Sequence, residues 1–114
     1  MDNIAVKFKT EDWNRSINLN LNGNFFLTRA LLTTMIKDDW GRVIHMSSIA
    51  GMRGTPGTIA YSTAKTGLLG MSKVLANEYA RFGITSNVII PGYFDTGLID
   101  TLDKKSRQKI LESI

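Results

Sequence analysis

Two short apolar segments on either side of one long helix-forming segment constrain the fold of this chain more than any other feature. RVIHMS (42–47) and ITSNVII (84–90) are typical of short buried strands. Between them, Thr58 can cap a helix over 59–82, which Gly83 would end. A strand, a crossover helix and a second strand form a βαβ unit, whose strands run parallel with a right-handed connection. The sequence therefore predicts the α/β class.

Further helices are expected before and after this unit. Thr10 can cap a first helix (11–36), with acidic residues in its first turn, and Gly41 would end that element. A last helix is expected over roughly 97–113. The middle of the first helix is rich in residues that form helix interiors poorly, so we predict polar contacts or a distorted turn there. These residues are Asn18, Asn20, Asn22, Gly23 and Asn24.

Three features of the βαβ unit should meet at one edge of the sheet. Ser48 follows the first strand, Pro91-Gly92 follows the second, and Tyr61 lies in the first turn of the crossover helix. Open α/β sheets bind ligands along the carboxyl ends of their strands. A loop rich in glycine, threonine and proline (49–58) leads into the same helix. The sequence therefore predicts a site at this edge, with the loop facing it.

Tyr61 and Lys65 are the most informative pair of side chains at this edge. Residues four apart on a helix lie on one face, so the Lys65 ammonium should lie beside the Tyr61 ring. A nearby ammonium favours the phenolate over the phenol and so promotes proton donation. Ser48 would be a second donor, aimed at the same substrate oxygen. This set can protonate a carbonyl oxygen at neutral pH.

Simpler interpretations of the same residues remain open. A tyrosine four residues before a lysine is often only a solvated pair on a helix surface, and Ser48 alone would more often be a turn residue. Ala60, Ala64 and Gly67 form a stripe of small residues on the same helix. That stripe favours close helix packing or a subunit contact over chemistry.

Composition excludes several other classes of site. The 114 residues suffice for one small domain and contain no cysteine, so neither a disulfide framework nor a thiolate metal site is expected. His45 is the only histidine, which argues against a multi-histidine metal site, and we predict no bound metal. The chain has no signal-peptide pattern and no apolar run of about 20 residues, so no membrane span is expected. A cytoplasmic location follows by default.

The net charge of +4 is modest. The densest basic cluster alternates with apolar residues and is typical of the solvated face of a terminal helix. We therefore expect no nucleic-acid binding, since no groove-reading motif accompanies the charge. A weak attraction for small anionic substrates such as coenzyme A thioesters is more plausible. The cluster comprises Lys104, Lys105, Arg107 and Lys109.

Motifs along nearly the whole chain resemble those of the classical short-chain dehydrogenases/reductases. They are NLNG (20–23), GRVIHMSS (41–48), YSTAK (61–65), GIT.N (83–87) and PGYFDT (91–96), in the family's order and spacing. The nearest likeness is to 3-oxoacyl-acyl-carrier-protein reductases and acetoacetyl-coenzyme A reductases. The resemblance implies a Rossmann-like, doubly wound parallel sheet and NAD(P)-dependent reduction of a ketone to a secondary alcohol. A 3-oxoacyl thioester is the expected substrate, with fatty acid biosynthesis as the context.

The resemblance also implies roles for single residues. Tyr61 is the expected general acid, and Lys65 promotes its ionisation and hydrogen-bonds the nicotinamide ribose. Ser48 is expected to polarise the carbonyl. Asn20 matches the helix asparagine that holds a water molecule in the proton relay to the lysine. The other asparagines of this helix remain open to a role as solvated residues only.

Cofactor and assembly are likewise implied by the resemblance. NADP is favoured, with NAD as the other candidate, and Tyr61 and Lys65 are expected to touch the cofactor. The family forms homodimers or homotetramers through the helices equivalent to 11–36 and 59–82. A loop after the second strand should hold the nicotinamide and pyrophosphate. Its residues are Pro91, Gly92, Phe94 and Thr96.

Five residues depart from the family pattern. Ile90 is bulkier than usual, and Ser86 stands where the strand usually carries an apolar residue. Asp38 and Asp39 precede the strand where a carrier-protein reductase would favour basic residues, which weakens that assignment. His45 lies in mid-strand, where we expect a structural role.

The resemblance covers only part of a typical family member, which is about twice this length. The glycine-rich turn, the residue that selects NAD or NADP, and the rest of the N-terminal dinucleotide-binding half have no counterpart in these residues. We therefore expect 1–114 to be a single partial domain, the catalytic portion of a reductase. The other hypothesis is an inactive fragment, or an interaction module that pairs through its long helices.

Overall fold

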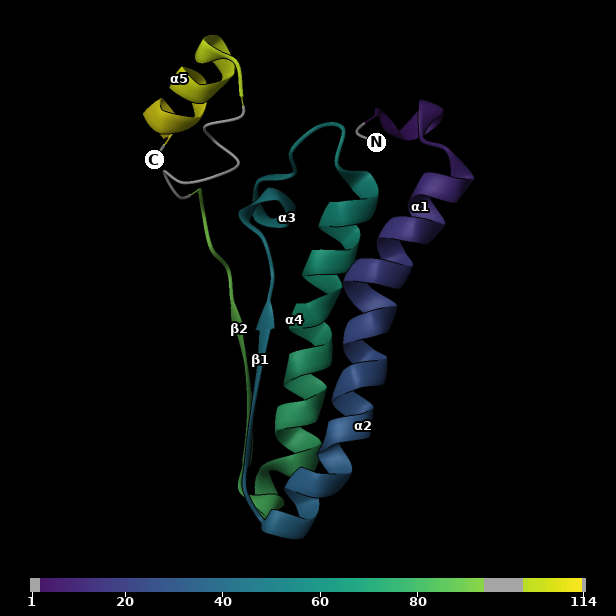
Figure 1. The fold of residues 1–114 in the computed structure, drawn as a ribbon, viewed down its shortest axis with the longest axis vertical. Helices are drawn as coiled ribbons and strands as arrows, with labels where there is room; N and C mark the ends of the chain where they lie inside the picture. Colours follow the sequence, from purple (N-terminus) through teal and green to yellow (C-terminus); the bar gives the residue numbers. More distant parts are fainter. Residues whose placement is uncertain (1–2, 94–101, 114) are drawn as a thin grey trace.

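The computed structural model describes residues 3–93 and 102–113. Its elements alternate between helices and strands as an α/β protein requires, and Figure 1 shows them in order of colour. In chain order they are η1 (Ala5–Lys7), α1 (Thr10–Ile17), the π-helical turn η2 (Asn18–Asn22), α2 (Gly23–Asp38), β1 (Gly41–Met46), α3 (Ile49–Arg53), α4 (Ile59–Tyr79), η3 (Ala80–Phe82), β2 (Ile84–Ile89) and α5 (Lys104–Ser113).

The predicted parallel strand pair is confirmed. Strands β1 and β2 pair in parallel, with Gly41 opposite Ile84 and Met46 opposite Ile89. Helix α4 and the 3-10 turn η3 that follows it lead into β2, and Gly83 closes η3 in the left-handed region at a φ of 69°. Glycine adopts this conformation without the steric cost that a Cβ brings. The partial Rossmann-like fold is therefore present, with strand ends within one residue of those predicted.

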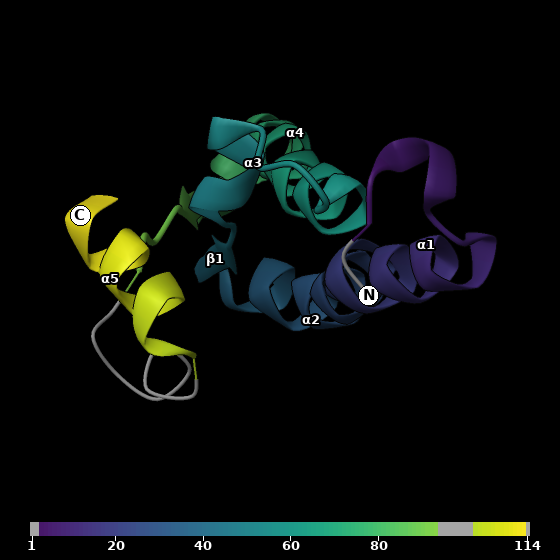
Figure 2. The same ribbon diagram turned by 90° about the horizontal axis from the view of Figure 1, so that it is seen from above.

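The two long helical segments lie side by side and run in the same direction, opposite to the strands (Figure 1). Exposure alternates along β1, as the period of a half-covered strand requires. Val43 and His45 are buried, whereas Ile44 and Met46 are exposed. Seen from above, α5 lies apart from α1 and α2 (Figure 2). Helix α2 contacts β1, and α4 contacts both strands, so these helices cover one face of the strand pair.

The apolar core lies near the first residues of both strands. It joins Leu32 of α2, Val43 of β1, Leu75 of α4 and Ile84 of β2, each no more than 8% exposed. Methionine, isoleucine and aromatic side chains pack around this cluster. They are Met35, Ile36, Met71, Tyr79 and Phe82.

The stripe of small residues on α4 allows close helix packing, as one of its two interpretations predicted. Ala60 and Ala64 are fully buried. A Cβ added at Gly67 would lie 3.2 Å from Cδ1 of Leu21, which belongs to the π-helical turn. The backbone of α4 therefore passes very close to the first helical segment.

The ends of the first helix differ from those predicted. Thr10 is the first helical residue, and extended Lys9 occupies the cap position and accepts the N–H of Trp13 at 3.0 Å. The helix ends at Asp39, whose φ of 48° is left-handed, so Gly41 does not end it. Instead, Gly41 begins β1 where a Cβ would lie within 3 Å of the Met35 side chain. Glycine at this position lets β1 lie close to α2.

Two other segments also differ from the prediction. The loop over 49–58 contains the short helix α3, because Ser48 caps it and Gly54 ends it at a φ of 64°. The last helix begins at Lys104, where Asp103 accepts the backbone N–H of Ser106 at 2.8 Å. The first part of the predicted span, 97–101, lies outside the described residues.

The predicted distortion of the first helix is confirmed. Residues 18–22 form a π-helical turn, in which the N–H of Gly23 reaches back to the carbonyl of Asn18. One departure from the family pattern also finds its physical reason. The hydroxyls of Ser86 on β2 and Ser72 on α4 lie 2.8 Å apart, so the polar strand residue has a partner across the buried interface.

Candidate functional site

The carboxyl ends of β1 and β2 form the edge at which the predicted site lies. The backbone N–H of Ser47 donates to the carbonyl of Ile89 at 2.8 Å, and that of Ile49 donates to Pro91 at 3.4 Å. Strand pairing thus continues past both strands. It holds the segment around Ser48 against the segment that leads into Gly92.

Tyr61 and Lys65 lie together in the first turns of α4, and Lys65 is anchored to the end of β1. Its Nζ lies 5.8 Å from the centre of the Tyr61 ring and donates to the carbonyl of Met46 at 2.9 Å. The Ser47 hydroxyl donates in turn to the backbone carbonyl of Lys65 at 2.7 Å. These two links run in opposite directions between helix and strand. They fix the ammonium beside the aromatic ring.

Ser48 sits in the extended conformation that caps α3. Its Oγ accepts the backbone N–H of Ala50 at 3.2 Å. The turn interpretation of Ser48 is therefore correct as far as it goes. Its hydroxyl hydrogen has no acceptor among the residues that the structure describes, and a hydroxyl can accept one hydrogen bond and still donate another.

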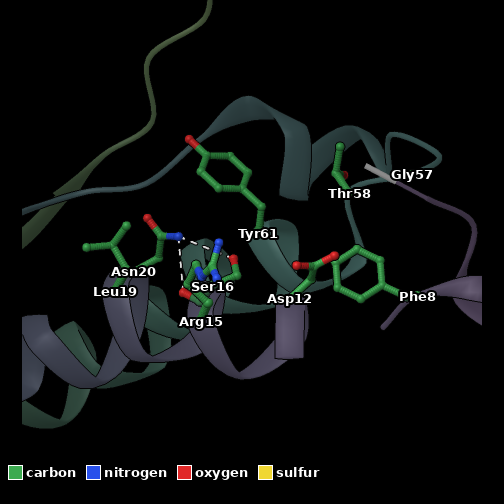
Figure 3. A pocket seen from close by; sticks show the side chains of 9 residues that line it. All are labelled: Phe8, Asp12, Arg15, Ser16, Leu19, Asn20, Gly57, Thr58 and Tyr61. Atoms are coloured by element: carbon green, nitrogen blue, oxygen red, sulfur yellow. Dashed lines mark hydrogen bonds between the residues drawn. The ribbon is translucent and has the colours of Figure 1, made fainter. Parts of the chain in front are cut away.

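A cavity of about 180 Å³ lies between α1 and the start of α4 (Figure 3). Tyr61 forms one wall and Asn20 the opposite one. The cavity mixes apolar, charged and hydroxyl side chains, as small-molecule sites commonly do. Its lining comprises Phe8, Asp12, Arg15, Ser16, Leu19, Asn20, Gly57, Thr58 and Tyr61.

Asn20 is held from both sides within the helix. Its Nδ2 donates to the backbone carbonyl of Ser16 at 3.1 Å and to the Ser16 hydroxyl at 3.3 Å. Its own backbone carbonyl accepts Nδ2 of Asn24 at 2.9 Å. Asn24 is half-buried and bonded, so its interpretation as a solvated residue only is wrong. Asn22 and Asn18 do pair at the exposed surface, at 2.7 Å.

The structure brings some of the predicted site residues together and leaves others apart. Asn20 and Tyr61 share the cavity, and Lys65 adjoins the Tyr61 ring. Ser48 and Pro91 lie at the neighbouring strand ends and do not line the cavity. Two predicted cofactor residues, Phe94 and Thr96, lie outside the described residues.

Sequence reasoning missed the part of the cavity contributed by α1. Asp12, Ser16, Asn20 and Asn24 follow one another at intervals of four, which places them on one helical face. That spacing could have found Ser16 and Asn24 as neighbours of Asn20. It could not have shown that α4 closes the other side.

His45 illustrates a buried polar group away from the edge. It is 3% exposed, and its Nε2 has no hydrogen-bond partner within the described part of the chain. Burial lowers the pKa of this imidazole below its usual value of 6.5, because the charged form loses its hydration. The position in mid-strand agrees with the structural role expected for it.

Two further classes of site were sought in residues 3–93 and 102–113. No three histidine, aspartate or glutamate side chains there are grouped so that they could hold a metal ion. No helix of these ranges is long and apolar enough to cross a membrane.

Comparison with known proteins identifies related sequences over almost the whole chain. Residues 2–107 match the family model described as short chain dehydrogenase. The 3-oxoacyl-[acyl-carrier-protein] reductase FabG of Rickettsia conorii is 41% identical over 113 residues, which are 99% of this chain and 47% of the relative. The 3-oxoacyl-[acyl-carrier-protein] reductase of Synechocystis sp. is 41% identical over 102 residues, 90% of this chain and 41% of the relative. FabG of Aquifex aeolicus is 36% identical over 113 residues, with coverages of 99% and 46%.

The parallel strand pair, the Tyr61–Lys65 helix and the family match agree on the class of protein. The chain belongs to the short chain dehydrogenase family. Among the relatives it matches, those named above are 3-oxoacyl-[acyl-carrier-protein] reductases, so the predicted resemblance is confirmed. The chain spans about half the length of these curated relatives.

Proposed function

We propose that this chain carries the proton-transfer half of an NAD(P)H-dependent oxidoreductase that reduces a ketone to a secondary alcohol. One observation carries the proposal. The Tyr61 hydroxyl makes no hydrogen bond with the described residues, and the Lys65 ammonium is fixed beside its ring. A phenol in this setting is free to donate its proton to a substrate oxygen.

The residues at the carboxyl ends of β1 and β2 have different roles in the proposed reaction. Tyr61 gives its proton to the carbonyl oxygen of the substrate as that oxygen gains charge. The Ser48 hydroxyl, whose hydrogen has no acceptor among the described residues, donates a hydrogen bond to the same oxygen. Lys65 stabilises the phenolate that Tyr61 becomes. A bound nicotinamide supplies the hydride.

The residues present at this edge fit a nicotinamide nucleotide. Lys65 uses one of its three N–H donors on Met46, which leaves donors for ribose hydroxyls. Among residues 3–93 and 102–113, a Cβ added at Gly92 would meet only Ile49 Cδ1, at 3.9 Å, so these residues let a ligand approach the backbone there closely. We propose Tyr61, Lys65, Pro91 and Gly92 as cofactor contacts, together with Phe94 and Thr96.

The substrate we propose is a 3-oxoacyl thioester, with NADPH as the preferred reductant. The names of the related reductases support this choice. The cavity beside Tyr61 offers the apolar side chains of Phe8 and Leu19 to a short acyl chain.

We propose a cytoplasmic homodimer or homotetramer that assembles through α1–α2 and α4. Both helical segments expose apolar side chains although they already pack against each other. Phe26 and Leu31 on α2 are 55% and 50% exposed, and Val74 on α4 is 55% exposed. Exposed apolar area of this kind is typical of subunit contacts.

The test follows nicotinamide absorbance when the purified protein meets NADPH and acetoacetyl-coenzyme A. We expect Lys65→Met to lower the rate by about a hundredfold or more, since it removes the cation beside the general acid. Lys73→Met changes an exposed lysine of the same helix and should keep the parent rate. Failure of the parent to oxidise NADPH, or equal rates in the two variants, would refute the proposed function.

A further inference from the structure

Helix α5 carries most of the net positive charge of the chain. Its residues include four basic side chains and one acidic one, a net charge of +3 against +4 for the whole sequence. The helix has two faces: Ser106, Arg107 and Ile110 are half-buried, whereas Lys105 and Lys109 are exposed. Lysines four residues apart lie on one helical face, so their ammonium groups are neighbours. The exposed face of α5 is therefore a concentrated patch of positive charge.

The acidic side chains near this face make hydrogen bonds with neutral partners. Asp103 accepts the backbone N–H of Ser106 at 2.8 Å and the Ser106 hydroxyl at 2.9 Å. Glu112 accepts Nε2 of Gln108 at 3.0 Å. Within residues 3–93 and 102–113, no carboxylate forms an ion pair with a lysine of α5. Like charges four residues apart on a helix repel each other, so an anion bound between them would relieve that repulsion.

An open groove of about 710 Å³ follows the exposed face of α5. Its lysine ammonium groups are compact donors, which bind phosphate oxygens as point charges. The amide of Gln108 adds a neutral donor, and Glu112 is the carboxylate in its wall. The lining comprises Lys104, Lys105, Gln108, Lys109 and Glu112. This composition favours an anionic ligand.

Helix α5 lies at the end of the molecule where the proposed reaction takes place. In Figure 1 it is at the same end as α3 and the first turns of α4, beyond the carboxyl ends of β1 and β2. Seen from above, it lies on the opposite side of α3 from α1 (Figure 2). A ligand that touches both Tyr61 and α5 must therefore be long, with its reacting group at one end.

We propose that the exposed basic face of α5 binds the phosphate groups of a coenzyme A thioester whose acyl group lies at Tyr61. The inference rests on the proposed function, in which a 3-oxoacyl thioester is the substrate. Coenzyme A carries a 3′-phosphate and a diphosphate, with about four negative charges at neutral pH. A long pantetheine arm separates these charges from the thioester. Both the charge of α5 and its place in the fold match such a ligand.

The first test measures binding and does not depend on reductase activity. Coenzyme A is titrated into the ¹⁵N-labelled chain, and NMR shifts give the dissociation constant. We expect Lys105→Gln/Lys109→Gln to weaken binding about fivefold or more, because two exposed ion pairs are lost. Glutamine and lysine have similar helix propensities, so the variant keeps the helix. Lys37→Gln/Lys73→Gln is the matched control, since it removes two exposed lysines from α2 and α4 and should bind as the parent does.

Two outcomes of this titration would overturn the proposal. One is a parent that does not bind coenzyme A, and the other is equal binding by the two variants. Either result would leave the basic face to another anionic partner, such as an acidic protein. Added salt should weaken binding by the parent more than binding by the variant that lacks the two α5 lysines, because salt screens exposed charges.

The second test asks whether the reaction uses the same contact. Acetoacetyl-coenzyme A is compared with acetoacetyl-N-acetylcysteamine, which carries the same acyl group on a short neutral arm. We expect Lys105→Gln/Lys109→Gln to raise KM about fivefold for the first substrate with kcat unchanged. KM for the second substrate and for NADPH should not change. An equal rise with both thioesters, or a rise for NADPH alone, would contradict the proposal. If the parent reduces neither thioester, the proposed function fails, and the titration alone decides on α5.

Discussion

The two ends of helix α4 differ in what they bury and in what they leave free. The end near Leu75 packs into an apolar cluster with α2 and both strands. The end near Tyr61 is held by hydrogen bonds to β1 and faces a cavity whose lining includes charged and hydroxyl groups. One helix thus carries part of the apolar core at its end and the proposed chemistry at its start.

This contrast explains why the fold can accommodate polar side chains at the start of α4. Burying polar groups is costly unless they are hydrogen-bonded. Here Ser47, Lys65 and Asn20 all have partners, and Tyr61 remains 38% exposed. The apolar end supplies burial that the edge cannot provide. Substitutions at the two ends should therefore separate stability from activity.

The largest effect on stability is expected from Leu75→Ala in the core cluster. Deleting a buried leucine side chain costs about 2–5 kcal/mol, because it loses burial and leaves a cavity. Lys73→Ala is the control on the same helix, since this side chain is exposed and is not one of the apolar residues proposed for the subunit contact. Urea unfolding measures both, and similar losses in the two variants would mean that the core does not lie where the structure places it.

The buried serine pair should give an intermediate effect. Ser72→Ala leaves the Ser86 hydroxyl without its partner, which costs about 1–3 kcal/mol. Changing both serines to alanine removes the unpaired group as well, so the double variant should be more stable than the sum of the single changes predicts. Thermal unfolding of the three variants forms a double-mutant cycle. Strict additivity would show that the two hydroxyls do not interact.

The two glycines of α4 should respond differently to the same change. Gly70 has open space where a Cβ would go, so Gly70→Ala should stabilise the helix by about 0.5–1 kcal/mol. At Gly67 the new methyl group would press on Leu21 at 3.2 Å, so Gly67→Ala should gain less or lose stability. Chemical denaturation of both variants measures this difference in the free energy of unfolding. An equal gain would mean that α4 does not pass as close to the π-helical turn as the structure shows.

The imidazole of His45 should make the free energy of unfolding depend on pH. Burial lowers its pKa in the folded state, so below about pH 6.5 the unfolded chain binds a proton that the folded chain does not. Its contribution is therefore constant above pH 6.5, and stability falls as the pH drops from there through the lowered folded pKa. His45→Gln should flatten this part of the curve in urea unfolding between pH 7.5 and 5.5. An unchanged slope would contradict the burial of His45.

The sequence predicts the βαβ unit because its signals are local. The period of the strands and the stop at Gly83 each act within a few residues. The ends of the first helix escaped prediction because Lys9, Asp39 and Gly41 are set by contacts with other elements. Helix α3 was missed because glycine and proline in 49–58 mask a short helix that Ser48 caps.

The residues of the candidate site could be named from the sequence, whereas its shape could not. Tyr61, Lys65, Ser48 and Asn20 follow from spacing and from the family resemblance. The cavity depends on how closely α1 lies to α4, which the small residues of α4 allow but do not specify. For the same reason the contact of Asn24 with Asn20 could be seen only once the π-helical turn was in view.

The central claim is that the Tyr61 end of α4 performs the proton transfer, and one pair of variants tests it most directly. Tyr61→Phe and Tyr79→Phe each delete one hydroxyl from a tyrosine of α4, at its start and at its end. With NADPH and acetoacetyl-coenzyme A, Tyr61→Phe should lose at least about a hundredfold in rate, because the proton donor is gone. Its free energy of unfolding should stay within about 0.5 kcal/mol of the parent, since the deleted hydroxyl makes no hydrogen bond with the described residues and the side chain is 38% exposed. Tyr79→Phe should keep the parent rate. Retention of the rate in Tyr61→Phe, or an equal loss in both variants, would contradict the account.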